Sequence, residues 1–252
     1  MVYTSRLNNK KILITGKTSR FCKYLFEDLK NYKTIFTDKR NFNILKFSKM
    51  EKFIKNKKIN YLIHIAGLSR PMAIHDKNIN SSIDLNILGT ANVVKLCEKY
   101  NIKLIYFSTN YVYPCKKGSY KETDPLLPIN NYAWSKLGGE CAVQMYKNSL
   151  ILRLCMTDYP FVHKKAVKGA KSSFIFNKSV SKILPYLINE LGVINVGGKS
   201  RDILSFAQKN SDAKIGSISI KKVKNFPKNS SINISKLKKI LSKKKKLKEL
   251  IF

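Results

Sequence analysis

The sequence predicts an α/β fold built on a doubly wound parallel sheet, and two observations predict it. Short, mainly apolar runs rich in β-branched residues alternate with longer segments of helical spacing, which is typical of βαβ units. The apolar runs are continuous and do not alternate with polar residues, as expected of strands that are covered by helices on both faces. A chain of 252 residues that is 44% hydrophobic can bury a sizeable core.

The expected strands follow one another at intervals along the whole chain. They are residues 11–15, 34–37, 61–65, 103–107, 150–154 and 193–196. A helix is expected from about residue 79 to residue 100, because Ile83, Ile87 and Ala91 recur at four-residue spacing on one face. Another helix is expected from about residue 131 to residue 146. After residue 154 glycine and proline punctuate shorter elements, which indicates a smaller lobe.

The formal net charge of +34 points, taken alone, to nucleic acid or an anionic membrane as a partner. Lysine, asparagine and isoleucine dominate the chain, however, and arginine is scarce. That pattern indicates a compositional bias, because bidentate base recognition favours arginine. We therefore expect no nucleic-acid partner.

No apolar run approaches the roughly 18 to 20 residues that a membrane-spanning helix needs, so we expect no stable membrane insertion. The first residues lack the apolar segment of a secretory signal. The five cysteines form no C-x-x-C pair and have no zinc-like spacing, which predicts reduced thiols and no metal site. A cytoplasmic location is the expectation.

The first expected strand leads into a turn at Gly16 and then into a helical run. This is where a dinucleotide pyrophosphate approaches a parallel sheet. The further glycines of the usual pattern are replaced, by Ser19 or Arg20 and by Cys22, depending on the register. Lys17 and Arg20 could supply positive charge in their place. An ordinary strand-to-helix turn is the alternative.

After the second strand, Asp38 stands where an acidic residue holds the adenosine ribose, and Arg40 stands where a basic residue accepts a 2′-phosphate. Arg40, with Lys39 beside it, slightly favours NADP over NAD. A solvated turn is the alternative for this segment too.

Tyr132 and Lys136 are four residues apart on an expected helix and therefore share a face. The ordinary pKa of a tyrosine, about 10, makes it a poor acid–base catalyst at neutral pH, and a nearby ammonium stabilises the phenolate. Thr109, at the end of the preceding strand, could hydrogen-bond a reacting carbonyl or hydroxyl.

The chain resembles the extended short-chain dehydrogenase/reductases, especially the dTDP-4-dehydrorhamnose reductase-like group of nucleotide-sugar enzymes. The segments that carry the resemblance are ITG at 14–16, YLIHIAG at 61–67, DLNILGTANVVKLC at 84–97, YFSTNYVYP at 106–114 and PINNYAWSKLGGE at 128–140. The resemblance implies a Rossmann-like dinucleotide-binding domain at residues 1–155 and a small substrate-binding lobe at 156–252. The lobe would contribute one further sheet strand near 193–196.

The resemblance also implies a reaction, the NAD(P)H-dependent reduction of a 4-keto nucleotide sugar, or a related epimerisation or dehydration. Tyr132 would be the general acid, Lys136 would lower its pKa and hold the nicotinamide ribose, and Thr109 would orient the carbonyl. The cofactor-binding residues would be Gly16, Thr18, Ser19, Arg20, Phe21, Asp38, Arg40, Ala66, Gly67, Asn86, Tyr132 and Lys136. A nucleotide sugar would be the substrate, and the resemblance also allows a homodimer.

Two other hypotheses follow from the altered glycine turn and from the Lys-rich C-terminal segment. The altered glycine turn is compatible with a non-catalytic binding or regulatory subunit, for which the regulatory subunit of methionine adenosyltransferase is a precedent in this group. The Lys-rich segment 235–252 could form a basic amphipathic helix that docks on an anionic membrane. The alternative for that segment is a final helix with a solvated lysine face.

Overall fold

The computed structural model describes residues 9–223, 226–242 and 249, and its chain divides into two compact units. The first unit comprises Met1–Ser108, Asn131–Leu152 and Leu184–Val193. The second comprises Thr109–Asn130, Arg153–Ile183 and Ile194–Phe252. Each unit is therefore assembled from segments that are distant in the sequence.

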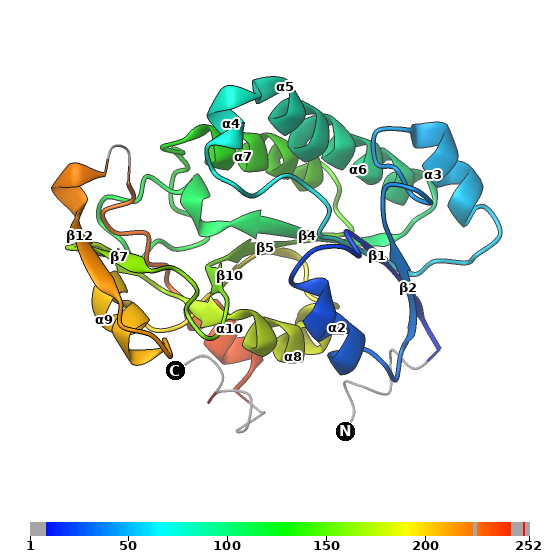
Figure 1. Ribbon diagram of the computed structural model, residues 1–252. Coiled ribbons are helices and arrows are strands. Elements are labelled where there is room, and N and C mark those ends of the chain that lie inside the picture. Colours follow the sequence, from blue (N-terminus) through cyan, green and yellow to red (C-terminus); the bar gives the residue numbers. More distant parts are fainter. Residues whose placement is uncertain (1–8, 224–225, 243–248, 250–252) are drawn as a thin grey trace. The chain divides into compact units, whose positions relative to one another are not determined.

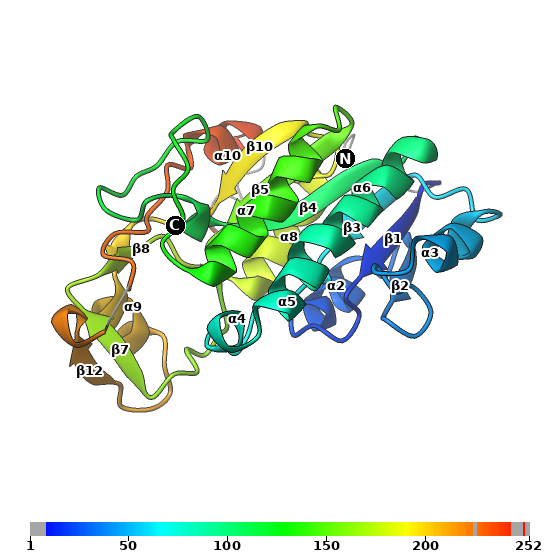
Figure 2. The same ribbon diagram turned by 90° about the horizontal axis from the view of Figure 1, so that it is seen from above.

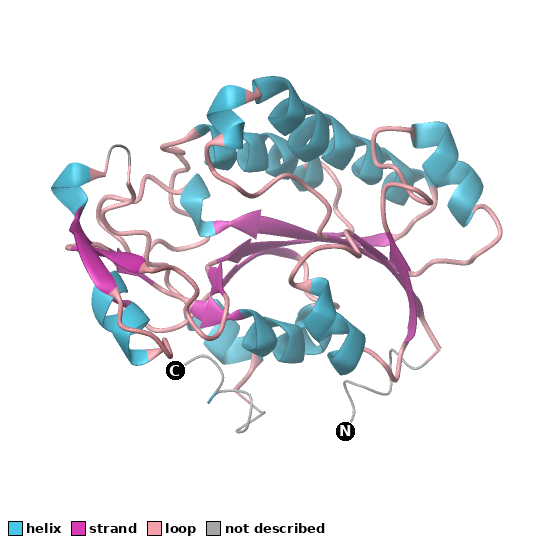
Figure 3. Ribbon diagram, in the orientation of Figure 1, coloured by secondary structure: helices cyan, strands magenta, loops and turns pink. Residues whose placement is uncertain are grey.

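A six-stranded sheet of order β10-β5-β4-β3-β1-β2 dominates the described residues (Figure 3). Its strands are β1 (Lys11–Thr15), β2 (Lys33–Thr37), β3 (Tyr61–His64), β4 (Lys103–Thr109), β5 (Ser149–Leu154) and β10 (Gly192–Val196). β1 pairs in parallel with β2 on one side and with β3 on the other, and β3 pairs in parallel with β4. The strand order reverses between β1 and β3, which creates a crevice at their carboxyl ends where ligands bind in such sheets.

The strands form where apolar runs were expected, and each lies within two residues of its predicted bounds. All residues of β4 and β5 are buried, whereas β2 at the edge is half-exposed. Continuous apolar sequence is the signature of a strand covered on both faces. The prediction of an α/β fold on a parallel sheet is confirmed.

Helices cover both faces of the sheet in the first unit (Figures 1 and 2). They are α2 (Cys22–Asp28), α3 (Phe47–Ile54), α4 (Ile74–Lys77), α5 (Ile79–Ser82), η1 (Ile83–Leu88), α6 (Gly89–Lys99) and α7 (Asn131–Gln144). α6 and α7 lie side by side on one face, and α2 lies on the other. The main core is built from β1, β3, β4, α3 and α6, with Leu13, Leu62, Val93, Leu96 and Leu104 fully buried.

The long helix expected from residue 79 to residue 100 is helical as predicted, but residues 83–88 have π-helical geometry. A π segment places one extra residue in a turn and shifts the faces of the helix on either side of it. The apolar spacing of the sequence is too coarse to reveal such a local shift. Asn86, the buried polar residue of this segment, is a predicted site residue.

The described part of the second unit contains three two-stranded sheets, which pair β6 with β9, β7 with β12 and β8 with β11. These strands are β6 (Met156–Thr157), β7 (Lys165–Lys168), β8 (Lys171–Ser172), β9 (Ile175–Phe176), β11 (Arg201–Asp202) and β12 (Gly216–Ser219). The short helices are η2 (Asn110–Val112), α9 (Ile203–Lys209), η3 (Ile220–Lys222) and α10 (Ser235–Ile240), while α8 (Asn177–Leu187) belongs partly to each unit. A separate small core includes Phe161, Val167 and Phe206.

Within the described residues, no helix is long and apolar enough to cross a bilayer. The basic C-terminal segment begins as α10, in which Leu237 is fully buried, as is Leu241 just after it. The start of the proposed membrane-docking face is therefore used for internal packing. Leu247, Leu250 and Ile251, apolar residues further along this segment, lie outside the described residues.

Candidate functional site

The turn after β1 depends on a glycine for two reasons. Gly16 has a φ of +81°, in the left-handed region, and a Cβ built on it would lie 2.9 Å from the backbone nitrogen of Ala66. A side chain at this position would both strain the backbone and strike the loop after β3. Gly16 and Ala66, both predicted to line the cofactor, are thus brought together at the switch point.

The turn continues through exposed Thr18 and Arg20 and half-buried Ser19. Cys22, where a third glycine was expected, is fully buried, and its Sγ donates to the Gly16 carbonyl at 3.1 Å. The cysteine therefore packs inside the turn. Phe21 is also buried, and its ring lies 5.3 Å from that of Phe107. The Phe21 side chain is therefore packed against Phe107 in the core.

A chain of hydrogen-bonded polar groups connects β1 to β3 next to this turn. It was not identified as a site from the sequence. The Thr15 hydroxyl accepts hydrogen bonds from the backbone N–H groups of Ile65 and Ala66, both at 3.1 Å, and lies 2.9 Å from His64 Nδ1. His64 Nε2 lies 3.2 Å from the Thr90 hydroxyl. Complete burial lowers the His64 pKa to about 3, so the ring is neutral and structural.

Asn86 connects the loop after β3 to helix α7. Its Oδ1 accepts from the Leu68 N–H at 2.7 Å, and its Nδ2 donates to the Leu68 carbonyl at 2.9 Å and to the Ser135 hydroxyl at 2.8 Å. Ser135 in turn donates to the Tyr132 carbonyl at 2.8 Å. A Cβ on Gly67 would lie 2.7 Å from Asn86 Oδ1, so this residue must also stay small. Asn86 is thus connected to the first turn of α7 through the Ser135 hydroxyl.

Helix α7 carries Tyr132 in its first turn and Lys136 one turn later. Tyr132 is half-buried, and its ring lies 5.1 Å from that of His75. Lys136 is 7% exposed, and its Nζ lies 4.2 Å from the centre of the Tyr106 ring. Burial lowers the Lys136 pKa to about 7, although the nearby Glu140 carboxylate acts in the opposite direction. The ammonium lies in a poorly solvated place where its charge acts strongly.

Glu140 and Ser108 are a buried pair that the sequence reasoning missed. Glu140 is fully buried one turn beyond Lys136, and its Oε2 accepts a hydrogen bond of 2.6 Å from the Ser108 hydroxyl. Its spacing of four residues from Lys136 is the signal that could have identified it. A buried carboxylate on the same helix face helps to keep the neighbouring ammonium charged.

Asp38 and Arg40 form an ion pair in the turn after β2. Arg40 Nη2 lies 2.8 Å from Asp38 Oδ2, and the backbone N–H of Arg40 donates to Oδ1 at 2.9 Å. These hydrogen bonds lower the Asp38 pKa to about 2. The Arg40 side chain is 83% exposed while that of Asp38 is 10% exposed. The Asp38 carboxylate is therefore paired with Arg40, whose guanidinium is exposed to solvent.

Thr109 ends β4 and is the first residue of the second unit. It is buried, and its Oγ1 accepts from the Tyr111 N–H at 3.3 Å, which caps η2. The hydroxyl keeps its proton to donate elsewhere. Tyr132 and Lys136 belong to the first unit, as do all the predicted cofactor-binding residues. Among the described residues, no group of three histidines, cysteines or acidic residues could hold a metal ion.

The first 157 residues of the chain include a segment similar to known proteins. Residues 10–157 match the family described as the RmlD substrate binding domain. Methionine adenosyltransferase 2 subunit beta from Xenopus laevis is 26% identical over 156 residues, covering 58% of this chain and 46% of that protein. A dTDP-4-dehydrorhamnose reductase from Aggregatibacter actinomycetemcomitans is 27% identical over 152 residues, covering 58% and 51%. The chain spans about half the length of these curated relatives.

A solved structure extends the likeness to most of the chain. The crystal structure of dTDP-4-dehydrorhamnose reductase from Bacillus anthracis, in complex with NADP, matches with a TM-score of 0.81 and 20% sequence identity. The match covers 91% of this chain and 92% of that one. The Rossmann-like fold predicted from the sequence is confirmed.

Proposed function

Because the chain belongs to the family of the RmlD substrate binding domain, we propose that it is an NAD(P)H-dependent oxidoreductase that reduces a 4-keto nucleotide sugar. The observation that carries the proposal is on α7, where Tyr132 and the buried ammonium of Lys136 lie one turn apart. One relative and one solved structure, both dTDP-4-dehydrorhamnose reductases, support the substrate class. Epimerisation or dehydration of a related sugar would use the same two residues.

The residues of the first unit fit a dinucleotide. Gly16 lets the backbone come close at the switch point, and Ala66 and Gly67 continue that surface after β3. The exposed Arg40 guanidinium suits the 2′-phosphate of NADP, which we slightly favour over NAD. Thr18 to Phe21 would approach the pyrophosphate. When bound, NAD(P)H would supply the hydride.

In this proposal the side chains of α7 handle the proton. Tyr132 donates its phenolic proton to the ketone oxygen as that oxygen gains negative charge. The resulting phenolate is stabilised by the Lys136 ammonium, whose attraction is strong because few water molecules screen it. Asn86, acting through Ser135, holds the first turn of α7 in place.

We assign Thr109 and the sugar to the second unit. The Thr109 hydroxyl would donate to the substrate carbonyl, since its acceptor side is used by the Tyr111 N–H. Residues 156–252, most of which belong to the second unit, would supply most contacts to the nucleotide sugar, and residues 1–155, most of which belong to the first unit, would supply those to the cofactor, with Thr109 as an exception. All five cysteines are free thiols and four of them are buried, which supports a cytoplasmic location.

The test is a calorimetric titration of the full chain with NADPH and NADH, followed by turnover with 4-keto nucleotide sugars. Tyr132→Phe should still bind cofactor and lose turnover by at least roughly 100-fold, because it lacks the acidic proton. Turnover that survives in Tyr132→Phe would contradict the mechanism. A double variant, Lys17→Ala with Arg20→Ala, should weaken cofactor binding if the turn uses charge in place of glycine.

A regulatory binding subunit is the second candidate, and the similarity to methionine adenosyltransferase 2 subunit beta favours it. The turn in which Ser19 or Arg20 and Cys22 replace glycine is compatible with this role. The same titration distinguishes the two functions. Cofactor binding without turnover of any 4-keto sugar would favour the regulatory role, whereas turnover that needs Tyr132 would exclude it.

A further inference from the structure

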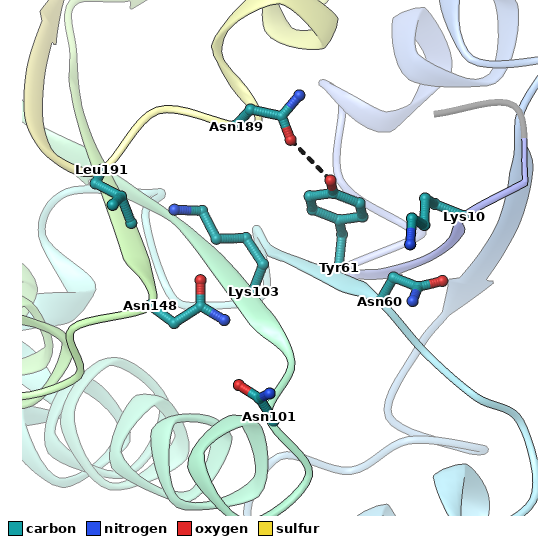
Figure 4. A pocket seen from close by; sticks show the side chains of 8 residues that line it. All are labelled: Lys10, Asn60, Tyr61, Asn101, Lys103, Asn148, Asn189 and Leu191. Carbon is teal, nitrogen blue, oxygen red and sulfur yellow. Dashed lines mark hydrogen bonds between the residues drawn. The ribbon is translucent and has the colours of Figure 1, made fainter. Parts of the chain in front are cut away.

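A cavity of about 290 Å³ lies at the amino ends of the parallel strands. Its lining residues precede or begin five strands of the sheet: Lys10, Asn60, Tyr61, Asn101, Lys103, Asn148, Asn189 and Leu191 (Figure 4). All of them belong to the first unit. The proposed cofactor site lies at the opposite, carboxyl edge of these strands, so the cavity is separate from it.

Lys103 is the buried base of this cavity. It begins β4 opposite Tyr61 of β3, is only 8% exposed, and its Nζ donates to the Glu190 carbonyl at 2.6 Å. In the described part of the chain its ammonium forms no ion pair. The Glu190 carboxylate attracts it only from a longer distance, and burial lowers the Lys103 pKa to about 8. Burying an ammonium whose hydrogen-bond partner is a neutral carbonyl costs free energy, and a bound anion would offset part of that cost.

The amide side chains around Lys103 present donors to the cavity. Asn60 Oδ1 already accepts from the Lys11 N–H at 2.9 Å, and Asn189 Oδ1 accepts from the Tyr61 hydroxyl at 2.7 Å. Each of these asparagines therefore has its NH₂ group left to offer. Figure 4 shows the Tyr61–Asn189 bond across the cavity from Lys103.

Among the described residues that line the cavity there is no aspartate or glutamate, and Lys10 adds a second ammonium at its rim. The Glu190 carboxylate acts on Lys103 only from outside this lining. Ammonium and amide N–H groups are the donors that an oxyanion recognises. The volume exceeds that of a few water molecules, each of which takes about 30 Å³. There is room for a phosphate group with part of its hydration.

We propose that this cavity is an anion-binding site for a phosphate group, with Lys103 as its central ligand and Asn60 and Asn189 as flanking donors. Inorganic phosphate and a phosphomonoester present the same group. The site is distinct from the proposed nucleotide site and does not depend on the proposed function. Binding there neutralises a buried charge and stabilises the folded first unit.

The test is a calorimetric titration of the full chain with inorganic phosphate at pH 7 and low ionic strength. Lys103→Met should weaken phosphate binding roughly tenfold or more, because it removes a charged hydrogen-bond donor. Lys30→Met, at an exposed lysine, is the matched control and should bind like the wild type. Equal affinities of Lys103→Met and wild type would overturn the proposal, as would equal weakening by Lys30→Met.

Asn189→Asp provides a second variant that keeps the shape of the side chain. Its carboxylate can still accept from Tyr61, and its charge should exclude phosphate and occupy Lys103. The Arg20→Ala variant tests the proposed cofactor turn as the competing phosphate site. Loss of binding in Arg20→Ala with retention in both cavity variants would instead assign phosphate to the cofactor turn and refute the cavity site.

A proton readout identifies the group that the anion meets. Sulfate does not titrate near pH 8, so its binding should take up protons there as Lys103 becomes fully charged, and this uptake should vanish in Lys103→Met. Lys10, Tyr61 and Glu190 are the other titratable groups beside Lys103.

NADPH affinity measured in the same variants separates failure of this proposal from failure of the proposed function. Competition by methyl phosphate would extend the site to phosphomonoesters, and its absence would restrict the site to inorganic phosphate.

Discussion

The Nζ of Lys136 lies 4.2 Å from the centre of the Tyr106 ring, and Lys136 is only 7% exposed. The attraction between an ammonium and an aromatic face offsets part of the desolvation cost, and the Glu140 carboxylate offsets a further part. The lowered pKa, about 7, shows that burial still dominates. A strongly perturbed lysine next to a tyrosine on one helix face is typical of a functional site.

Replacement of Lys136 by methionine, combined with Glu140→Gln so that no buried carboxylate is left without its cation, should stabilise the fold at neutral pH by about 1–2 kcal/mol, since both buried charges are removed. The folded-state pKa lies below the unfolded value of about 10.4. Between these pH values the unfolded chain binds more protons, so the stability of the wild type rises with pH. The gap between the proteins should therefore shrink by pH 9.5. Urea denaturation at both pH values checks this, and a double variant less stable than wild type at pH 7 would contradict it.

If the proposed function holds, turnover should fall as the pH rises above about 7, because the Lys136 ammonium that would stabilise the Tyr132 phenolate loses its proton. Lys136→Arg retains the charge to much higher pH, since the pKa of arginine exceeds 12. Its residual activity should therefore lack the alkaline decline. Single-turnover rates from pH 6 to pH 9.5 measure both profiles. A decline that is identical in Lys136→Arg would assign the titration to another group.

Asn86→Ala should destabilise the fold by about 2–3 kcal/mol, because it leaves the Leu68 backbone and the Ser135 hydroxyl without their buried partner. Asn92→Ala is the matched control in the neighbouring helix, where the side chain makes one hydrogen bond, to the Ile44 carbonyl. That control should cost about 1 kcal/mol. Urea denaturation measures both, and equal losses would show that Asn86 is not a special brace.

Arg40→Ala should lower NADPH affinity roughly tenfold and leave NADH affinity unchanged or improved, because it removes the cation for a 2′-phosphate and frees the Asp38 carboxylate for a ribose. Lys49→Ala, at an exposed lysine of α3, is the control and should change neither affinity. The variant should also raise the Asp38 pKa from about 2 toward its ordinary value, which NMR titration detects without any cofactor. Equal weakening for both cofactors would contradict the assignment of Arg40.

The positions of the main strands along the chain follow from local sequence. Apolar runs such as residues 150–154 have to be buried on both faces, and Gly16 suits a turn in which the backbone takes positive φ and approaches a neighbouring loop. The spacing of Tyr132 and Lys136 likewise places both on one helix face, since that depends only on the pitch of the helix. The π geometry of residues 83–88 and the short strands of the second unit were not predictable in the same way. They are set by contacts with distant segments and carry too few residues for a periodic signal.

By itself, then, the sequence determined the parallel α/β architecture and the identity of the tyrosine and lysine pair, because hydrophobic periodicity and helical spacing are local properties. Tertiary structure alone decided that Lys136 lies against Tyr106, that Asn86 meets Ser135, and that Lys103 forms the base of a polar cavity. Each of these facts joins residues that are distant in the chain. Burial and partners determine the charge state of a side chain, and only the packed fold brings those partners together.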